Sequence, residues 1–366
     1  MRGRANLIPR LDESGDRSLP SSSVVGAFVF PEFWNDPERA KSGIASLRES
    51  GVTAIMTESD SYEHFVVDLA HQAGLRFYAG VACFSDHASN FRWIKEHEES
   101  WPILETGGPR QQMEWYIGMP PTDRRRQEDV LAEVARIART YSIDGLFLDF
   151  VRWPLHWEIE LRQGRSRPLD SSFDAVTLAA FEEATGSLPR GLDTVSARAT
   201  WIQENRFRSW VDFKCKIITD FVRMARNALK DERPDAELGI YVVPDVNGLA
   251  EPLTGQRVRD LEPLVDWVAP MLYQNILLQP PSWIGTALAD LIQAAGGKTL
   301  PVVQADSNRD PLVAADWGPS MSDADWSATL SGVAHCSNVA GLIVFPGTAL
   351  MGARGESLKS MLKVWG

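Results

Sequence analysis

A carboxylate, a guanidinium and an indole close an otherwise apolar run at residues 143–154, IDGLFLDFVRWP. Burying a carboxylate without a partner costs several kcal/mol, so a purely buried strand should not carry one. We therefore expect Asp149, Arg152 and Trp153 to lie where a buried strand ends and a carboxylate can be solvated, paired or used. The alternative is a structural Asp149 that accepts bonds from loop amides and pairs with Arg152.

Side chains of the same kinds follow the other apolar runs of the chain. They are Glu32 and Trp34, then Glu58, Asp245, Tyr273 with Gln274, and Gln304 with Asp306. Carboxyl groups can act as acid, base or nucleophile on an acetal, amides and Arg bind hydroxyls, and aromatic faces stack on sugar rings. The pattern therefore predicts a carbohydrate site with Asp149 as a catalytic carboxylate. The predicted substrate-binding residues are Glu32, Trp34, Glu58, Arg152, Trp153, Tyr273, Gln274, Gln304 and Asp306.

Hydrolysis of an acetal requires a second carboxyl group beside Asp149. Asp245 is the first choice, because it follows the next apolar run and can fall within the separation that such chemistry uses. Its alternative is a turn residue, since Pro-Asp-Val-Asn-Gly is also a good loop signal. Glu58, Asp306 and Glu32 stay open as the second carboxyl group.

The elements that must position these residues are eight short apolar runs alternating with longer segments of helical period. This alternation predicts parallel strands joined by crossover helices. The predicted strands are Val24 to Phe30, Val52 to Thr57, Leu75 to Phe84, Ile143 to Phe150, Glu237 to Val243, Val265 to Tyr273, Thr299 to Ala305 and Ala340 to Phe345. We expect a single (β/α)8 TIM barrel, a fold that typically needs about 250 residues.

We expect the barrel to occupy residues 24–366 as one catalytic domain, behind a flexible N-terminal tail at residues 1–23. The surplus length falls into insertions after strands three and four, at residues 85 to about 122 and 155–204. Both insertions follow the carboxyl ends of strands, where barrel enzymes build their sites. In the second insertion, Ser171 or Ser172 can cap the helix that follows.

Strand alternation predicts which side chains of the fourth strand point into the barrel. Successive side chains of a strand point to opposite faces, so Phe147 and Asp149 share one face and Leu146 and Leu148 the other. We expect the face with Phe147 to line the lumen, which places Asp149 at its mouth.

The composition limits the partners and the compartment. With 49 acidic and 37 basic side chains the formal charge is −12, which disfavours nucleic acid and anionic membranes and favours a neutral or cationic ligand. The three cysteines are scattered, and no signal peptide or membrane span is visible, so we expect a cytoplasmic protein. Metal motifs and glycine-rich phosphate loops are not visible, so we expect no cofactor. The sequence does not indicate an oligomeric state.

The sequence resembles a bacterial family of glycosyl-hydrolase-like (β/α)8 barrels. The resemblance covers most of residues 119–275 and centres on the fourth strand, which has the pattern DGxxLDFxRxP from Asp144 to Pro154. RFRSWVDFKCKIITDFVRMARNALKDERPDAELGIYV and LVDWVAPMLYQN look like the family's next helix and its fifth and sixth strands. The resemblance implies a glycoside hydrolase in which Asp149 is one catalytic carboxylate and Arg152 and Tyr273 line the site. Asp245 is not part of the resemblance and rests on its position alone.

Two hypotheses follow from these patterns. The first is a glycoside hydrolase that cleaves an oligo- or polysaccharide by a two-carboxylate mechanism. The second is a carbohydrate-binding barrel without hydrolase activity, or a sugar-processing lyase, because barrels host many reactions. A second carboxyl group facing Asp149 distinguishes the first hypothesis from the second.

Overall fold

The computed structural model describes residues 23–58, 64–87, 91–306 and 317–365 of the chain. The predicted N-terminal tail, apart from its last residue, lies outside these ranges.

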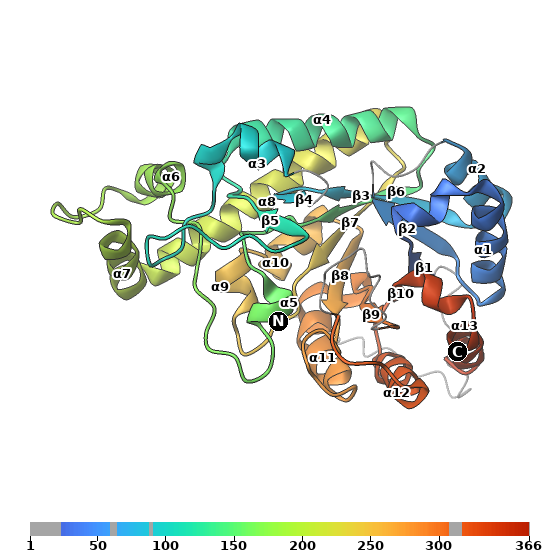
Figure 1. Ribbon diagram of the computed structural model, residues 1–366. Helices are drawn as coiled ribbons and strands as arrows, with labels where there is room; N and C mark the ends of the chain where they lie inside the picture. Colours follow the sequence, from blue (N-terminus) through green and yellow to red (C-terminus); the bar gives the residue numbers. More distant parts are fainter. Residues whose placement is uncertain (1–22, 59–63, 88–90, 307–316, 366) are drawn as a thin grey trace, which may run out of the picture.

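Eight parallel strands close into a barrel in the order β1-β10-β9-β8-β7-β6-β3-β2 (Figure 1). They are β1 (Val24–Phe28), β2 (Ala54–Glu58), β3 (Arg76–Ala82), β6 (Gly145–Asp149), β7 (Glu237–Val242), β8 (Trp267–Leu272), β9 (Val302–Gln304) and β10 (Gly341–Phe345). Each strand overlaps one of the eight predicted ranges, and the predicted (β/α)8 barrel is confirmed.

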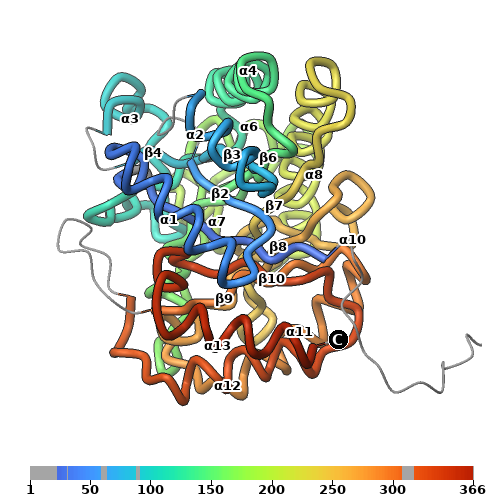
Figure 2. The backbone as a smooth tube through the Cα atoms, turned by 90° about the vertical axis from the view of Figure 1, so that its right-hand side faces the viewer, coloured from blue at the N-terminus to red at the C-terminus, as the bar shows by residue number. Residues whose placement is uncertain are grey.

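Helices surround the barrel on all sides. The longest are α4 (Arg124–Thr140) and α8 (Phe207–Glu232), which lie together at the top of Figure 2, opposite α11 (Trp283–Ala295), α12 (Asp323–Ala334) and α13 (Ala353–Leu362). The others around the barrel are α1 (Pro37–Glu49), α2 (His64–Gln72), α9 (Ala250–Thr254) and α10 (Val258–Leu261), with 3-10 turns η1 (Pro31–Asn35), η3 (Glu262–Leu264), η4 (Gly296–Lys298) and η5 (Gly347–Leu350). Within the described part of the chain, no helix combines the length and apolar character needed to cross a membrane.

The alternation of β6 divides its side chains between two cores. Leu146 and Leu148 belong to the outer core between strands and helices, whereas Phe147 belongs to the core inside the barrel. The Phe147 ring stacks on Tyr241 of β7 at a centroid distance of 5.0 Å. A side chain at Gly239 would put its Cβ 2.3 Å from the Phe147 ring, so glycine makes room for it there. Phe147 therefore fills the lumen, and Asp149, two residues further along the same face, reaches its mouth.

The two insertions form structure of their own. The first contains a two-stranded antiparallel sheet of β4 (Ser85–His87) and β5 (Tyr116–Gly118), together with α3 (Arg92–Glu96) and η2 (Glu98–Ser100). The second contains α5 (Trp157–Glu160), α6 (Ala175–Thr185) and α7 (Val195–Asn205). Helices α6 and α7 extend to the left of the barrel in Figure 1, away from α1, α2 and α13.

The predicted cap of α6 is wrong. Asp174 caps the helix by accepting the Thr177 amide at 2.9 Å. The two serines have other partners: Ser171 donates its hydroxyl to the Pro154 carbonyl, and the Ser172 hydroxyl accepts the Ile103 amide. Asp174 stands immediately before the helix, whereas the serines precede it by three and four residues and bind other parts of the insertions.

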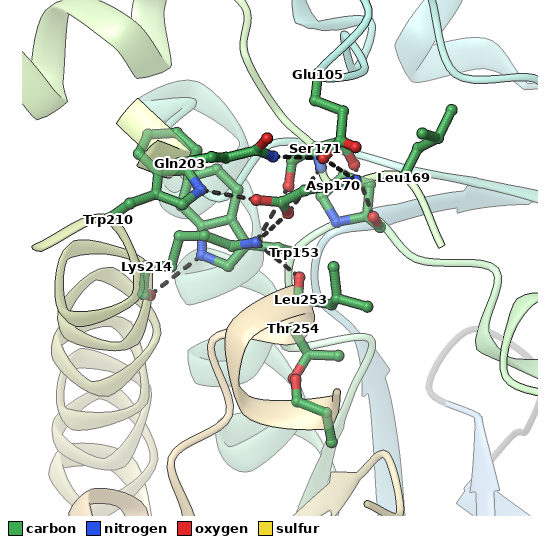
Figure 3. Close-up of polar contacts among 12 residues, drawn as sticks. Glu105, Trp153, Leu169, Asp170, Ser171, Gln203, Trp210, Lys214, Leu253 and Thr254 are labelled. Carbon is green, nitrogen blue, oxygen red and sulfur yellow. Dashed lines mark hydrogen bonds and ion pairs between the residues drawn. The ribbon is translucent and has the colours of Figure 1, made fainter. Parts of the chain in front are cut away.

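A buried ion pair anchors the second insertion to the barrel helices (Figure 3). The Lys214 ammonium on α8 lies 2.6 Å from Asp170 Oδ1 and also donates to the Leu253 carbonyl of α9 at 2.8 Å. Trp210 donates to the other oxygen of Asp170 at 2.8 Å. The Trp153 indole, which is fully buried, donates to the Lys214 carbonyl at 3.1 Å. These bonds fix the segment that follows Asp149 against α8.

We expect the replacement of one partner of this pair to destabilise the fold strongly. Lys214→Met should lower the free energy of unfolding by about 3–5 kcal/mol, because it leaves a buried carboxylate without its cation. The double variant Lys214→Met/Asp170→Asn should recover part of this loss, since no unpaired charge remains. Urea unfolding of the three proteins measures both effects. Equal losses in the single and double variants would contradict this role of the pair.

Candidate active site

A cavity of about 330 Å³ opens where the carboxyl ends of the strands meet. Its lining includes residues at the ends of β1, β2, β6, β7, β8 and β10 and residues of both insertions. They are Phe28, Phe30, Glu32, Glu58, His87, Trp115, Asp149, Phe150, Arg152, Trp157, Glu158, Tyr241, Met271, Tyr273, Trp317 and Phe345. Active sites of barrel enzymes lie at this end, and a concave site with a few convergent polar groups is typical of small-ligand pockets.

Asp149 is the last residue of β6, and the chain turns sharply after it. Phe150 has a φ of +49°, a left-handed conformation that is uncommon for a non-glycine residue. The turn lets the Phe150 amide donate to Asp149 Oδ1 at 2.6 Å. Burial raises the pKa of Asp149, while the Arg152 charge and the Phe150 amide act in the opposite direction. The amide of the next residue thus helps to hold the Asp149 carboxyl group in place at the cavity.

Arg152 lines the cavity and is only 4% exposed. Its guanidinium stacks over the Phe150 ring, with the central carbon 4.6 Å from the ring centroid. Its Nη2 donates to the Tyr116 hydroxyl at 3.4 Å and lies 3.8 Å from Glu158 Oε1. Its buried Nε has no hydrogen-bond partner among the described residues. The charge of this one guanidinium lowers the pKa of both Asp149 and Glu158.

Glu158 is a second carboxyl group of the cavity, carried by the short helix α5 in the second insertion. Its side chain is 13% exposed. Burial raises the pKa of Glu158 to about 7, although Arg152 and the hydrogen bond from Tyr116 lower it. A carboxyl group with such a pKa is protonated for much of the time near neutral pH, which suits a general acid.

The raised pKa of Glu158 predicts a pH dependence of folding stability. The folded protein keeps the Glu158 proton up to about pH 7, whereas the ordinary carboxyl pKa is 4.5. Stability from this group is therefore complete at low pH and is lost as pH rises from 4.5 through 7. Between pH 5 and 8 this group should lower the free energy of unfolding of the wild-type protein by up to about 3 kcal/mol. Glu158→Gln should not show this decrease. Urea unfolding of both proteins at the two pH values checks this, and identical pH dependence would contradict it.

Aromatic rings form the walls of the cavity. Tyr273 stacks on Phe345 at 4.7 Å, and Phe30 stacks on Trp317 at 5.8 Å. The Tyr241 hydroxyl is buried in the lining and has no hydrogen-bond partner among the described residues. Flat apolar faces beside unpaired polar atoms match the two kinds of surface of a sugar ring.

The structure brings five of the predicted site residues together and leaves the others outside the cavity. Its lining contains Asp149, Arg152, Tyr273, Glu58 and Glu32.

Asp245 lies in a different place from Asp149. It is exposed, accepts the Ala250 amide at 3.0 Å, and lines a separate groove of about 610 Å³ with Asn247 and Trp283. That groove shares no lining residue with the cavity.

The other predicted residues have structural partners near the rim. Trp34 donates to Thr57, Trp153 to Lys214, and Gln274 to Thr329. Gln304 binds the Trp317 carbonyl and the Ile276 amide, and so supports the loop that carries Trp317. Asp306 lies 3.4 Å from Arg354 in an ion pair.

Glu158 and Tyr241 were not predicted as site residues. The signal for Tyr241 was present, because Glu237, Gly239 and Tyr241 alternate along β7 on the lumen face. Glu158 carried no such signal, since it lies in a four-residue helix within a loop. Among the described residues, no three His, Cys, Asp or Glu side chains are grouped so that they could hold a metal ion.

The fold and the cavity define a (β/α)8 barrel whose cavity is lined by four carboxyl groups, those of Glu32, Glu58, Asp149 and Glu158. No protein-family model and no curated protein matches the sequence. Solved structures resemble it in fold. The PgaB (BpsB) glycoside hydrolase domain from Bordetella bronchiseptica has a TM-score of 0.69 at 13% identity, over 93% of this chain and 99% of that one.

Two further barrels are similar. The catalytic domain of the β-amylase from Paenibacillus polymyxa has a TM-score of 0.62 at 11% identity, over 94% of this chain and 99% of that one. The β-galactosidase from the psychrophilic Marinomonas ef1 has a TM-score of 0.64 at 12% identity, over 93% of this chain but only 59% of that longer one. The fold is thus shared with glycoside hydrolases.

Proposed function

We propose that this protein is a glycoside hydrolase that uses Asp149 and Glu158 as its two catalytic carboxyl groups. The observation that carries the proposal is their joint place in one cavity, with the Arg152 guanidinium close to Glu158 and lowering the pKa of both. Two carboxyl groups in different environments can take the two roles that cleavage of an acetal requires. This proposal replaces Asp245 by Glu158 as the second carboxyl group.

Glu158 is the general acid in this proposal. With its pKa near 7 it donates a proton to the glycosidic oxygen as the bond to the leaving sugar breaks. Burial raises the pKa of Asp149, and Arg152 and the Phe150 amide act against this rise; in its charged form Asp149 stabilises the positive charge that develops at the anomeric carbon. Water then adds to the anomeric carbon and gives its proton to the Glu158 carboxylate, which restores the acid, and each half of the substrate leaves with a hydroxyl group.

The aromatic walls supply the binding surface. Tyr273, Trp317 and Phe345 offer ring faces to the sugar, and the polar side chains of Arg152 and Tyr241 line the same cavity. The shared fold with solved glycoside hydrolases supports the same class of substrate, an oligo- or polysaccharide. Glu58 and Glu32 would contact the substrate at the edge of the cavity.

Incubation of the wild-type protein with a broad oligosaccharide panel tests the proposal, with reducing ends and product anomers followed by NMR. The expected result is cleavage of at least one member of the panel and a single anomer formed first. Saturable binding of a sugar without cleavage would overturn the proposal and support a carbohydrate-binding barrel. An unsaturated product would instead indicate a lyase.

A further inference from the structure

The hydroxyl group of Tyr116 lies within hydrogen-bond distance of Glu158, the proposed general acid. Tyr116 lies on β5 of the first insertion, is 1% exposed, and is not part of the cavity lining. Its hydroxyl oxygen is 3.1 Å from Glu158 Oε2 and 3.1 Å from the Leu155 carbonyl, and it accepts a hydrogen bond from Arg152 Nη2 at 3.4 Å. Residues of the first insertion thus contact the catalytic segment of the second.

The Tyr116 hydroxyl has one proton and two acceptors within reach. Because Arg152 already donates to its oxygen, the proton is available to Leu155 or to Glu158. Burial raises the pKa of Tyr116 well above its usual value, so the phenol keeps this proton. A hydrogen bond to an ionised carboxylate is stronger than one to a neutral carbonyl, so the Tyr116 hydroxyl donates to Glu158 whenever Glu158 is charged.

We propose that Tyr116 is a positioning residue for Glu158, donating to Oε2 so that Oε1 carries the proton that the carboxyl group exchanges. It also steadies the carboxylate that remains after the proton has left. The predicted effect of Tyr116 on turnover rests on the proposed function. Its predicted effect on the titration midpoint of Glu158 does not. Among the described residues, the other titratable or charged groups that face Glu158 or share its cavity are Arg152, Asp149, Tyr241, Tyr273, Glu32, Glu58 and His87.

Loss of the Tyr116 hydroxyl should make Glu158 harder to ionise. Infrared or ¹³C NMR titration of carboxyl groups, with Glu158→Gln to assign the signal, gives the Glu158 midpoint in the substrate-free protein. We expect Tyr116→Phe to move this midpoint about one pH unit upward, the shift expected for one hydrogen bond to a charged group. An unchanged or lowered midpoint would overturn the proposal.

Tyr241→Phe is the matched control, because it removes a buried hydroxyl from the same site without a bond to Glu158. The Glu158 midpoint should stay in place in this variant. A shift as large as that of Tyr116→Phe would show that the effect is not specific to the Tyr116 bond, and would also overturn the proposal.

A second substitution keeps the test open if Tyr116→Phe does not fold. Replacement of Tyr116 by 3-fluorotyrosine keeps the ring and makes the hydroxyl a better donor, so the Glu158 midpoint should fall. No shift, or an upward one, would contradict the proposal. The high-pH limb of kcat/KM should move with the midpoint in each variant. Moved midpoints in a protein that cleaves no sugar would leave this inference standing while the proposed function fails.

Discussion

Asp149→Asn should lower kcat by about 10⁴-fold on any oligosaccharide that the wild-type protein cleaves. The amide has nearly the shape of the carboxyl group and can still accept the Phe150 amide, but it carries no charge to stabilise the transition state. Binding should persist, because aromatic faces and other donors of the cavity supply it. Initial rates and a binding isotherm on the same sugar measure the two effects separately.

Unfolding of Asp149→Asn serves as the control for this experiment. Burial of Asp149 disfavours its charged form, so the neutral amide should leave the variant at least as stable as the wild type near neutral pH. A stable variant with wild-type turnover would rule out the catalytic role of Asp149. A variant that binds no sugar at all would indicate that Asp149 acts mainly in binding.

Glu158→Gln should lower kcat/KM by about 10²–10⁴-fold on substrates with an ordinary sugar as the leaving group. The amide has no proton to give, and such a leaving group departs poorly without one. An aryl glycoside with a nitrophenol leaving group should be affected far less, because it needs no acid. The fall in kcat/KM above about pH 7 should also disappear, since the group that causes it is gone. Rates on both kinds of substrate across the pH range measure these effects.

Asp245→Asn is the matched comparison for Glu158→Gln. Asp245 lines a separate groove and is exposed, so its replacement should leave kcat/KM within about twofold of the wild type on the substrate with an ordinary sugar as the leaving group. The reverse result, a large loss in Asp245→Asn and none in Glu158→Gln, would assign the second catalytic role to Asp245 instead.

The barrel was predictable because each strand is a short apolar run set between helical segments. Because side chains alternate along a strand, Asp149, the last residue of β6, points to the same face as Phe147, which lies inside the barrel. Glu58 ends β2 in the same way, and both residues line the cavity. Where a side chain belongs to a strand, its direction follows from the period of the strand.

Side chains beyond the strand ends were harder to place. β7 ends at Val242, so Asp245 lies three residues into a loop, where no period sets its direction and the Ala250 amide holds it outward. Glu158 lies in the second insertion, which distant contacts hold in place, such as Asp170 with Lys214 and Tyr116 with Glu158 itself. These contacts join residues far apart in sequence and leave no local pattern.

The most direct test of the central claim is a crystal structure of Asp149→Asn bound to an oligosaccharide that the wild-type protein cleaves. We expect the sugar in the aromatic cavity, with its glycosidic oxygen about 3 Å from a Glu158 oxygen and its anomeric carbon facing residue 149. A sugar bound in the groove beside Asp245, or one whose glycosidic oxygen lies out of reach of Glu158, would contradict the assignment of these two residues as the catalytic pair.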